Sequence, residues 1–310
     1  MTAAAVMVGI VLLAWASNQF VIGAARIAAI RRVAPLLVGV VIIGFGTSAP
    51  EMVVSALAAA RGEPEVALGN VIGSNLANLG LILGVGVVIY PLAVASGTVR
   101  REAPLALVAT IAFALLVQGG VGRLEGAALL TGMALTLILV IRRRPHDPLA
   151  DEAAAVVGGG GRFGLEVLRT GAGLAGTLAG SQLLLWGALE LAADAGLDAG
   201  FVGATVVALG TSLPELVTVV QSARRRQGDL VLGNLLGSNI FNALAVGGIT
   251  GLLGGVGLAA PALTGPAAVA MVAQVAIVWW MMRTGRRISR AEGVVLLLSY
   301  GALIPFLGVR

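Results

Sequence analysis

Two polar stretches interrupt an otherwise apolar sequence, and the second is a copy of the first. The first reads GTSAPE at residues 46–51 and then GNVIGSNLAN at 69–78, while the second reads GTSLPE at 210–215 and then GNLLGSNIFN at 233–242. Both segments recur at one offset, since 210 minus 46 and 233 minus 69 are each 164. Each copy places a carboxylate, hydroxyls and amides inside a hydrophobic run. Such groups are costly in a membrane, so they indicate an ion pathway.

The spacing inside each copy gathers oxygen atoms on one helix face. Thr47 and Ser48 precede Glu51 by four and three residues, which places the three side chains together on an α-helix. The second copy repeats this spacing with Thr211, Ser212 and Glu215. Further along each copy, a serine and an asparagine lie one turn apart: Ser74 with Asn78, and Ser238 with Asn242.

A proline directly precedes each glutamate of the two copies. Pro50 and Pro214 lack a backbone N–H and clash with the carbonyl four residues back, so we expect the helix to open near 44–47 and 208–211. Freed carbonyl groups persist in a membrane only where they face protein or line a cavity. A bound cation would satisfy them.

Carboxylate, hydroxyl, amide and carbonyl oxygens are hard ligands, and Ca²⁺ takes six to eight of them in flexible geometry. Mg²⁺ demands a tighter octahedron and fits less well. The chain has no cysteine and a single histidine, His146, in a polar loop, so a zinc or copper site is not expected. Two glutamates balance one divalent cation. Without a cation they would repel, and one is expected to take a proton, which favours exchange over one-way flow.

The composition predicts a polytopic membrane protein. Hydrophobic residues make up 58% of the chain and charged residues 11%, with a mean hydropathy of +1.00, which is more apolar surface than a soluble domain of this size can bury. The net charge of +5 is interpreted as cytoplasmic membrane loops rather than as a nucleic-acid surface. The expected surroundings are membrane lipid, with no nucleic acid and no obligate protein partner.

A bilayer core requires about 20 apolar residues per helix. On that measure we predict an all-α fold of ten membrane spans, at about 3–23, 36–60, 66–90, 103–120, 125–141, 166–190, 200–223, 229–254, 262–282 and 291–308. Five spans per half is an odd number, so the second half must enter the membrane upside down. The prediction is therefore two inverted five-helix repeats, as in many secondary transporters, at 1–141 and 164–310, joined by a cytoplasmic linker at 142–163.

Arginine is distributed unevenly over the predicted loops. The loops after the odd-numbered spans hold 17 of the 20 basic residues, and the opposite side holds only Arg61, Arg123 and Arg310. The positive-inside rule puts the crowded side in the cytoplasm, so both termini are expected on the outer side of the cell (inner) membrane. The segment 3–23 has no basic region before it and is interpreted as a retained first helix rather than a signal peptide.

These motifs closely resemble the two alpha-repeats of the sodium/calcium exchanger family, within the cation/calcium antiporter superfamily, in a form without the large regulatory domain of animal exchangers. The resemblance implies a transporter and not an enzyme, with Na⁺ and Ca²⁺ as transported ions, no cofactor, and alternating access by sliding of the first and sixth spans. It implies side-chain ligands and two backbone carbonyls at the following positions: Thr47, Ser48, Glu51, Ser74, Asn78, Thr211, Ser212, Glu215, Ser238, Asn242, Gly44 and Ala208.

The sequence also departs from some relatives. Those associated with potassium co-transport carry Asp where this chain has Asn78 or Asn242, which argues against potassium dependence. Proton-coupled relatives carry an extra acid near Gly73 and Gly237, which is missing here.

Alternatives nevertheless remain open from the sequence. They are a calcium (or other cation)/proton antiporter of the same fold, a passive cation channel, and an intramembrane enzyme that uses Glu51 and Glu215 as an acid pair. The serines and threonines would also suit simple helix packing. Four further asparagines are interpreted as links between helices: Asn70, Asn75, Asn234 and Asn239.

Overall fold

The structure of the 310-residue chain is a computed structural model that describes residues 2–31, 47–95, 97–143, 162–254 and 263–307. In the first half of the chain, the elements are α1 (Thr2–Ile30), α3 (Ala49–Ala60), α4 (Pro64–Leu76), the π-helical η1 (Ala77–Ile82), α5 (Leu83–Ile89), β1 (Leu92–Ala93), the π-helical η2 (Thr98–Glu102), α6 (Ala103–Leu116) and α7 (Arg123–Arg143). The all-helical class predicted from the sequence is confirmed, apart from one two-residue strand pair.

The second half repeats this order. Its elements are α9 (Phe163–Ala195), α10 (Ala199–Val202), η3 (Gly203–Val207), α11 (Ala208–Thr211), α12 (Leu213–Arg224), α13 (Gly228–Phe241), η4 (Asn242–Val246), α14 (Gly247–Gly254), η5 (Leu263–Ala267), α15 (Ala268–Gly285), β2 (Arg287–Ile288) and α16 (Arg290–Leu307). The starts of α3 and α12 differ by 213 minus 49, and those of α4 and α13 by 228 minus 64, which is 164 in both cases. The motif offset is therefore also an offset of helices.

The described residues contain fewer long apolar helices than the ten spans predicted. Six helical stretches are long and apolar enough to cross a membrane, and a seventh is the pair 199–211 and 213–224, bent by 47°. The predicted span 103–120 corresponds to α6, which has only 14 residues, and 125–141 corresponds to α7, which carries arginine at both ends. The predicted span 36–60 is described only in part, by α3. Six or seven spans by length and composition still make this a multi-pass membrane protein.

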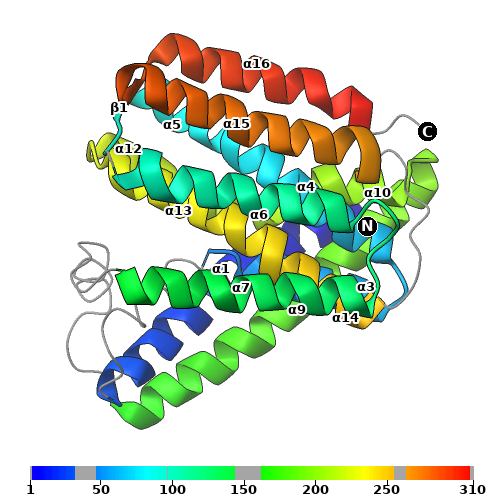
Figure 1. The fold of residues 1–310 in the computed structure, drawn as a ribbon. Coiled ribbons are helices and arrows are strands. Elements are labelled where there is room, and N and C mark those ends of the chain that lie inside the picture. Colours follow the sequence, from blue (N-terminus) through cyan, green and yellow to red (C-terminus); the bar gives the residue numbers. More distant parts are fainter. Residues whose placement is uncertain (1, 32–46, 96, 144–161, 255–262, 308–310) are drawn as a thin grey trace.

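The helices that carry the GN-rich motifs lie at the centre of the bundle. In the most apolar windows of 64–89 and 228–254, 78% and 83% of residues are buried, against 28% for α1 and 22% for α16. Figure 1 shows α15 and α16 side by side on one flank and α1 with α9 on the opposite flank. The halves interlock, because α5 packs on α16 and α7 packs on α14. The strand pair joins them too, with Leu92 opposite Ile288.

Helices α1 and α9 pack along each other with almost no side chains between their backbones. A Cβ added to Gly9 would lie 2.6 Å from the backbone nitrogen of Leu184, and one added to Gly180 would lie 2.7 Å from that of Leu13. Small residues at a helix interface allow this close approach, which is the common mode of packing between membrane helices.

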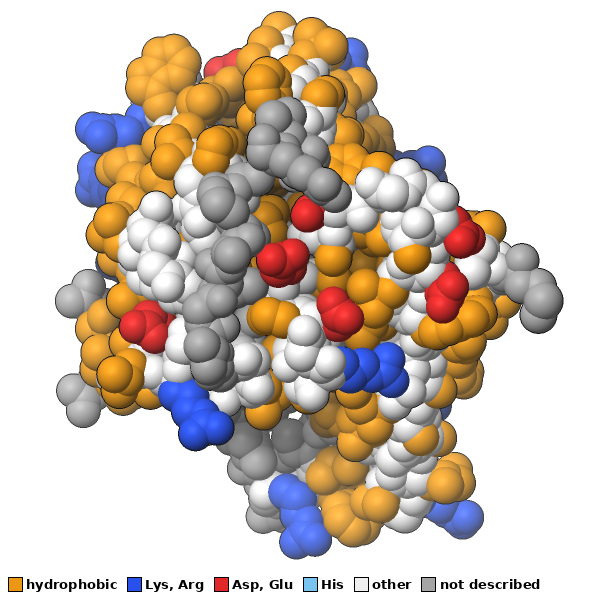
Figure 2. All heavy atoms as spheres, turned by 90° about the vertical axis from the view of Figure 1, so that its right-hand side faces the viewer, with side chains coloured by type: hydrophobic (Ala, Val, Ile, Leu, Met, Phe, Trp, Pro, Cys, Tyr) orange, Lys and Arg blue, Asp and Glu red, His pale blue; other side chains and the backbone are white. Residues whose placement is uncertain are grey.

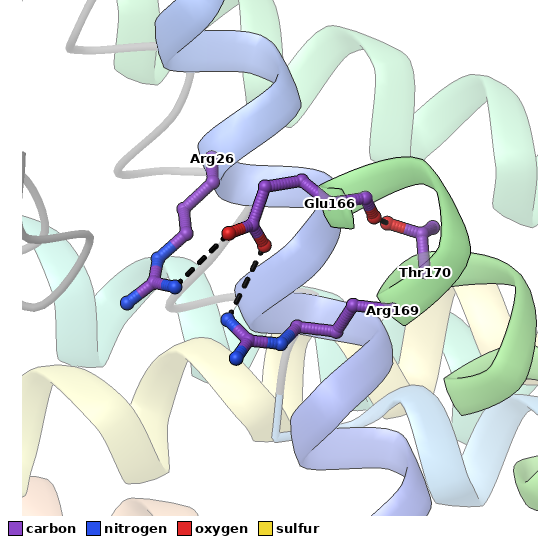
Figure 3. A network of polar contacts seen from close by, with 4 residues as sticks. All are labelled: Arg26, Glu166, Arg169 and Thr170. Carbon is purple, nitrogen blue, oxygen red and sulfur yellow. Dashed lines mark hydrogen bonds and ion pairs between the residues drawn. The ribbon is translucent and has the colours of Figure 1, made fainter. Parts of the chain in front are cut away.

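One end of the α1–α9 pair carries a network of charges (Figure 3). The Glu166 carboxylate of α9 accepts hydrogen bonds from Arg26 of α1 at 3.1 Å and from Arg169 at 3.2 Å. The backbone carbonyl of Glu166 accepts a bond from the Thr170 hydroxyl at 2.7 Å. The glutamate is buried, whereas the two arginines are partly exposed, so the network fastens α1 to α9 near the surface.

The surface divides into apolar flanks and charged ends. Large hydrophobic side chains are exposed along the outer helices, for example Met7, Val11 and Trp15 on α1 and Leu298 and Phe306 on α16. Figure 2, which faces the right-hand ends of the helices in Figure 1, shows acidic side chains gathered on that face. Lipid requires the first kind of surface and water the second, since ionised groups are costly at membrane depth.

Candidate ion-binding site

Each proline–glutamate motif begins a new helix. Helix α3 begins at Ala49 after Ser48, and α12 begins at Leu213 after Ser212; both serines have nearly the same backbone angles, φ −88° and ψ 7° for the first and φ −84° and ψ 9° for the second. Proline is tolerated in a first turn because the N–H it lacks has no helical partner there. The break expected near 208–211 is found one residue further on: residues 208–211 form the short helix α11, and the chain bends by 47° at Ser212, between α11 and α12.

These helix starts suit a cation held by acids. Glu51 and Glu215 both lie in first turns, where the positive end of the helix dipole stabilises a carboxylate. On the other side of the bend, α11 ends at Thr211, and the end of a helix presents carbonyl oxygens that favour a cation. The broken helix thus brings both kinds of helix end to one place.

The two glutamates come together from the two halves of the chain. Both are fully buried, with no exposed side-chain surface, and they interact electrostatically with each other. The Oε1 atom of Glu51 accepts a hydrogen bond from the Ser212 hydroxyl at 2.9 Å, and that of Glu215 accepts one from the Ser238 hydroxyl at 3.4 Å. An acid pair with hydroxyl neighbours, away from lipid, is the arrangement that the sequence predicts.

Further hydrogen bonds cross between the halves. The Thr47 hydroxyl donates to Asn234 Oδ1 at 3.3 Å and lies 3.1 Å from the Ser238 hydroxyl. Asn78 Nδ2 donates to Asn239 Oδ1 at 3.0 Å, and Asn239 Nδ2 donates to the Asn75 carbonyl at 3.3 Å. The side chains of Asn78, Asn234 and Asn239 therefore link the halves, as the sequence predicts for Asn234 and Asn239, whereas Asn75 takes part only through its backbone carbonyl.

Asn70 is the most extensively bonded polar side chain near the acids. Its Nδ2 donates to the Ser55 hydroxyl at 2.9 Å and to the backbone carbonyl of Glu51 at 3.3 Å. Its Oδ1 accepts bonds from Thr211 at 3.1 Å and from Ser74 at 3.4 Å. Asn70 thus joins α3, α4 and α11, which confirms its predicted role as a link between helices.

Several buried polar atoms at this place have no hydrogen-bond partner among the described residues. They are Ser48 Oγ, Glu51 Oε2, Glu215 Oε2, Asn78 Oδ1, Asn75 and Asn242 Oδ1 and Nδ2, and Asn234 Nδ2. Buried polar groups in proteins are nearly always paired, so a cluster of unpaired ones requires an explanation. Most of these atoms are oxygens with free lone pairs, and a hard cation is the partner that such oxygens accept.

Three other predicted ligands are not among these unpaired oxygens. The Ala208 carbonyl already accepts bonds from the Ser212 N–H at 3.0 Å and the Thr211 hydroxyl at 3.1 Å, so it must give up one of them to reach an ion. Ser74 bonds to Asn70 rather than to a glutamate. Gly44 and the predicted helix opening near it lie in 32–46, outside the described residues.

Gln274, a buried amide on α15 beside η1, is not among the predicted site residues. A signal was present, because Gln274 is the lone polar residue in the apolar stretch 265–282. Within the described part of the chain, no three His, Cys, Asp or Glu side chains gather closely enough to hold a metal ion. What remains is two carboxylates amid neutral oxygens, which suits a transported hard cation.

Comparison with known proteins agrees with this chemistry. The chain matches the sodium/calcium exchanger protein family over residues 1–142 and 166–309. It is 39% identical to a putative antiporter, CaxA, of Alkalimonas amylolytica over 95% of both chains, and 28% identical to the sodium/calcium exchanger MaX1 of Methanosarcina acetivorans over 97% of both.

A solved structure of the sodium-calcium exchanger NCX_Mj superposes with a TM-score of 0.67 at 28% identity, covering 98% of each chain. These relatives are exchangers and antiporters, not enzymes, and the shared antiporter function rests on both sequence and fold. The chain belongs to the sodium/calcium exchanger family.

Proposed function

We propose that this protein is a sodium-driven calcium antiporter of the cell membrane, in which Na⁺ and Ca²⁺ bind in turn at mid-membrane between two inverted repeats. The observation that carries the proposal is the pair of fully buried glutamates, Glu51 and Glu215, which meet from opposite halves amid unpaired oxygens. Two negative charges match one divalent cation, and the neutral hydroxyl and amide oxygens complete its shell.

The proposed ligands are the twelve predicted from the sequence. Those joined directly to the acid pair by hydrogen bonds are Ser212 and Ser238, with Thr47 bonded to Ser238. Asn78 and Asn242 contribute side-chain oxygens that are buried and unpaired. The Ala208 carbonyl would join once it gives up one of its two present bonds, and the Gly44 carbonyl is proposed from the sequence alone. No cofactor is required for exchange of this kind.

Ten spans in two inverted repeats, at 1–141 and 164–310, remain the proposed architecture. Equivalent helices pack against each other, α1 on α9 and α6 on α15, and the cross-contacts α5 with α16 and α7 with α14 are also equivalent. This pairing is what a two-fold axis in the membrane plane would produce, and such repeats support alternating access. The excess of arginine on one side supports a cytoplasmic linker at 142–163 and both termini outside the inner membrane.

The test distinguishes sodium from protons as the ion that drives calcium transport. Liposomes that contain the purified protein should take up ⁴⁵Ca²⁺ when a sodium gradient is imposed alone, and should not do so with a pH gradient alone. Liposomes without protein measure the passive leak of Ca²⁺, and liposomes with the Glu51→Gln variant are the control for protein that lacks the acid pair. Calcium uptake that follows the pH gradient and ignores sodium would instead establish the calcium/proton antiporter, and current without counter-ion would establish a channel.

A further inference from the structure

Gln274 is a buried amide outside the proposed ligand set. It lies on α15, 4% exposed, in an otherwise apolar stretch of helix. With its amide oriented to satisfy both neighbours, the nitrogen donates to the backbone carbonyl of Leu76 at 3.3 Å and the oxygen accepts from the backbone N–H of Gly80 at 3.0 Å. Both bonds reach the chain where α4 passes into η1.

The two backbone groups that Gln274 bonds would pair with each other in an unbroken α-helix, since Gly80 follows Leu76 by four residues. Here the helix runs through a π-helical segment, in which the Leu83 N–H bonds to the Asn78 carbonyl five residues back. The Gln274 amide is inserted into the gap in the α-helical ladder. Side-chain insertion of this kind is a recognised cause of local helix distortion, and such π-bulges are frequent at functional sites.

Gly80 leaves the room that this insertion requires. A Cβ added to Gly80 would lie 2.4 Å from the terminal amide of Gln274 and 2.8 Å from Tyr300 Cβ. The equivalent segment of the second half, η4, is also π-helical, with the Gly247 N–H bonded to the Asn242 carbonyl, but it has neither part of this arrangement. The position equivalent to Gly80 is Leu244, and the one equivalent to Gln274 is Thr110, whose hydroxyl donates to the Ala106 and Leu107 carbonyls of its own helix at 3.0 Å each.

The segment held in this way contains Asn78. Its Nδ2 donates across the halves to Asn239 at 3.0 Å, and its Oδ1 is buried without a partner. We propose that Gln274 is a positioning residue for Asn78: its amide bonds the two backbone groups freed where the π-helical segment 77–82 begins, fixes that segment against α15 and thereby sets the affinity of the ion site for Ca²⁺. The inference rests on the proposed function, because it takes Asn78 as a ligand.

The experiment replaces the amide by an apolar side chain of similar length. In reconstituted Gln274→Met, the half-saturating Ca²⁺ concentration for uptake should rise about tenfold, which is the usual scale for loss of a group that orients a metal ligand. The maximal rate per folded protein should stay within about twofold of wild type, because the ligands themselves remain. Amide hydrogen exchange in 77–82 should become about tenfold faster, since the segment loses its two external bonds.

Matched variants separate this role from general packing. Thr110→Val changes the equivalent buried position of the other half and should leave the half-saturating concentration unchanged. Gly80→Ala displaces the amide by a second route and should raise the half-saturating concentration in the same direction as Gln274→Met. Gly301→Ala, where an added Cβ meets nothing within 4 Å, is its control.

Two results would overturn the inference while leaving the proposed function intact. The first is a Gln274→Met protein that exchanges with the wild-type half-saturating concentration. The second is one that loses maximal rate alone, which would show a structural role. Wild-type protein without sodium-dependent calcium uptake would instead refute the proposed function. In that case, equilibrium dialysis of the detergent-solubilised protein with Ca²⁺ alone decides the inference: equal binding by wild type and Gln274→Met overturns it, and weaker binding by the variant supports it.

Discussion

Glu51 and Glu215 occupy the same place in two copies of one motif, yet their surroundings differ. Glu51 accepts a bond from Ser212 of the opposite half at 2.9 Å, whereas Glu215 accepts a longer one, 3.4 Å, from Ser238 of its own half. The residue equivalent to Ser212 is Ser48, which is buried and has no partner among the described residues. The first half of the site is therefore more tightly bonded than the second.

The asparagines show the same difference. Asn70 makes three bonds within the first half and accepts one from Thr211 of the second, whereas its equivalent, Asn234, keeps the matching bond from Thr47 and has an unpaired Nδ2. Asn78 bonds across to Asn239, but both side-chain atoms of its equivalent, Asn242, are unpaired. Near-identical motifs thus take unequal contacts. Under the proposed alternating access, unequal contacts are expected in any one state, and the opposite state is expected to bond Ser48 to Glu215.

The largest effect is expected at the two glutamates themselves, and there the two halves should respond alike. Glu51→Gln and Glu215→Gln should each reduce sodium-driven calcium uptake by at least about 100-fold, equivalent to about 2.8 kcal/mol, because each removes one of the two negative charges that balance the divalent cation. The measurement is ⁴⁵Ca²⁺ uptake into proteoliposomes by variants that elute as folded monodisperse protein. Glu125→Gln, which removes a carboxylate that accepts the Gly122 N–H at 3.0 Å, is the control. Full flux in both variants would refute the site.

The next largest difference is expected in stability, between substitutions of the equivalent residues Asn70 and Asn234. Asn70→Ala should lower the free energy of unfolding by about 2–3 kcal/mol, because it leaves several buried partners unpaired, whereas Asn234→Ala should cost about 1 kcal/mol. Thermal unfolding in detergent, without calcium, measures the difference. Equal losses would mean that the unequal bonding in the structure does not persist in solution.

The equivalent serines Ser212 and Ser48 test whether the two halves contribute unequally to Ca²⁺ binding. Ser212→Ala removes a bond to a carboxylate and should raise the half-saturating Ca²⁺ concentration about tenfold, since hydrogen bonds to charged groups contribute about 1.5–3 kcal/mol. Ser48→Ala removes a neutral ligand of the cation but no bond to a carboxylate, so it should raise the half-saturating concentration less, by about threefold. Uptake measured from one side of the membrane is required. Similar shifts in both would show that the halves exchange this contact during transport, so that neither arrangement dominates.

Much of this organisation could be predicted from the sequence because local chemistry determines it. The 164-residue offset predicted the recurrence of helices, and Pro214 predicted the break that the 47° bend confirms. Among the described residues, six or seven helical stretches are long and apolar enough to cross a membrane, fewer than the ten spans predicted: α6 has only 14 residues, which apolar length alone cannot reveal, and the span at 36–60 is described only in part. Hydropathy along the sequence does not define the residue at which a helix begins.

The unequal bonding of the two halves could not be predicted. Near-identical motifs carry no local difference that would assign Ser212 a partner and leave Ser48 without one. Such contacts depend on how the halves meet, which is a property of the whole bundle. Gln274 is missed for a related reason: its importance lies in two backbone groups almost 200 residues away along the chain, at 76 and 80.

The smallest effect is expected at the ends of the α1–α9 pair, where the halves also differ. Glu166 joins Arg26 and Arg169 at one end, while the positions equivalent to Arg26 and Glu166 are Glu190 and Thr2, which cannot form an ion pair. Because both arginines are partly exposed, Glu166→Gln should lower the free energy of unfolding by only about 1 kcal/mol. The loss of stability should shrink in about 1 M salt, where the Debye length falls to about 3 Å and partly exposed ion pairs are weakened. Glu190→Gln should change stability by less than about 0.5 kcal/mol. Equal and salt-independent losses would show that packing of the two backbones, rather than the charge network, fastens α1 to α9.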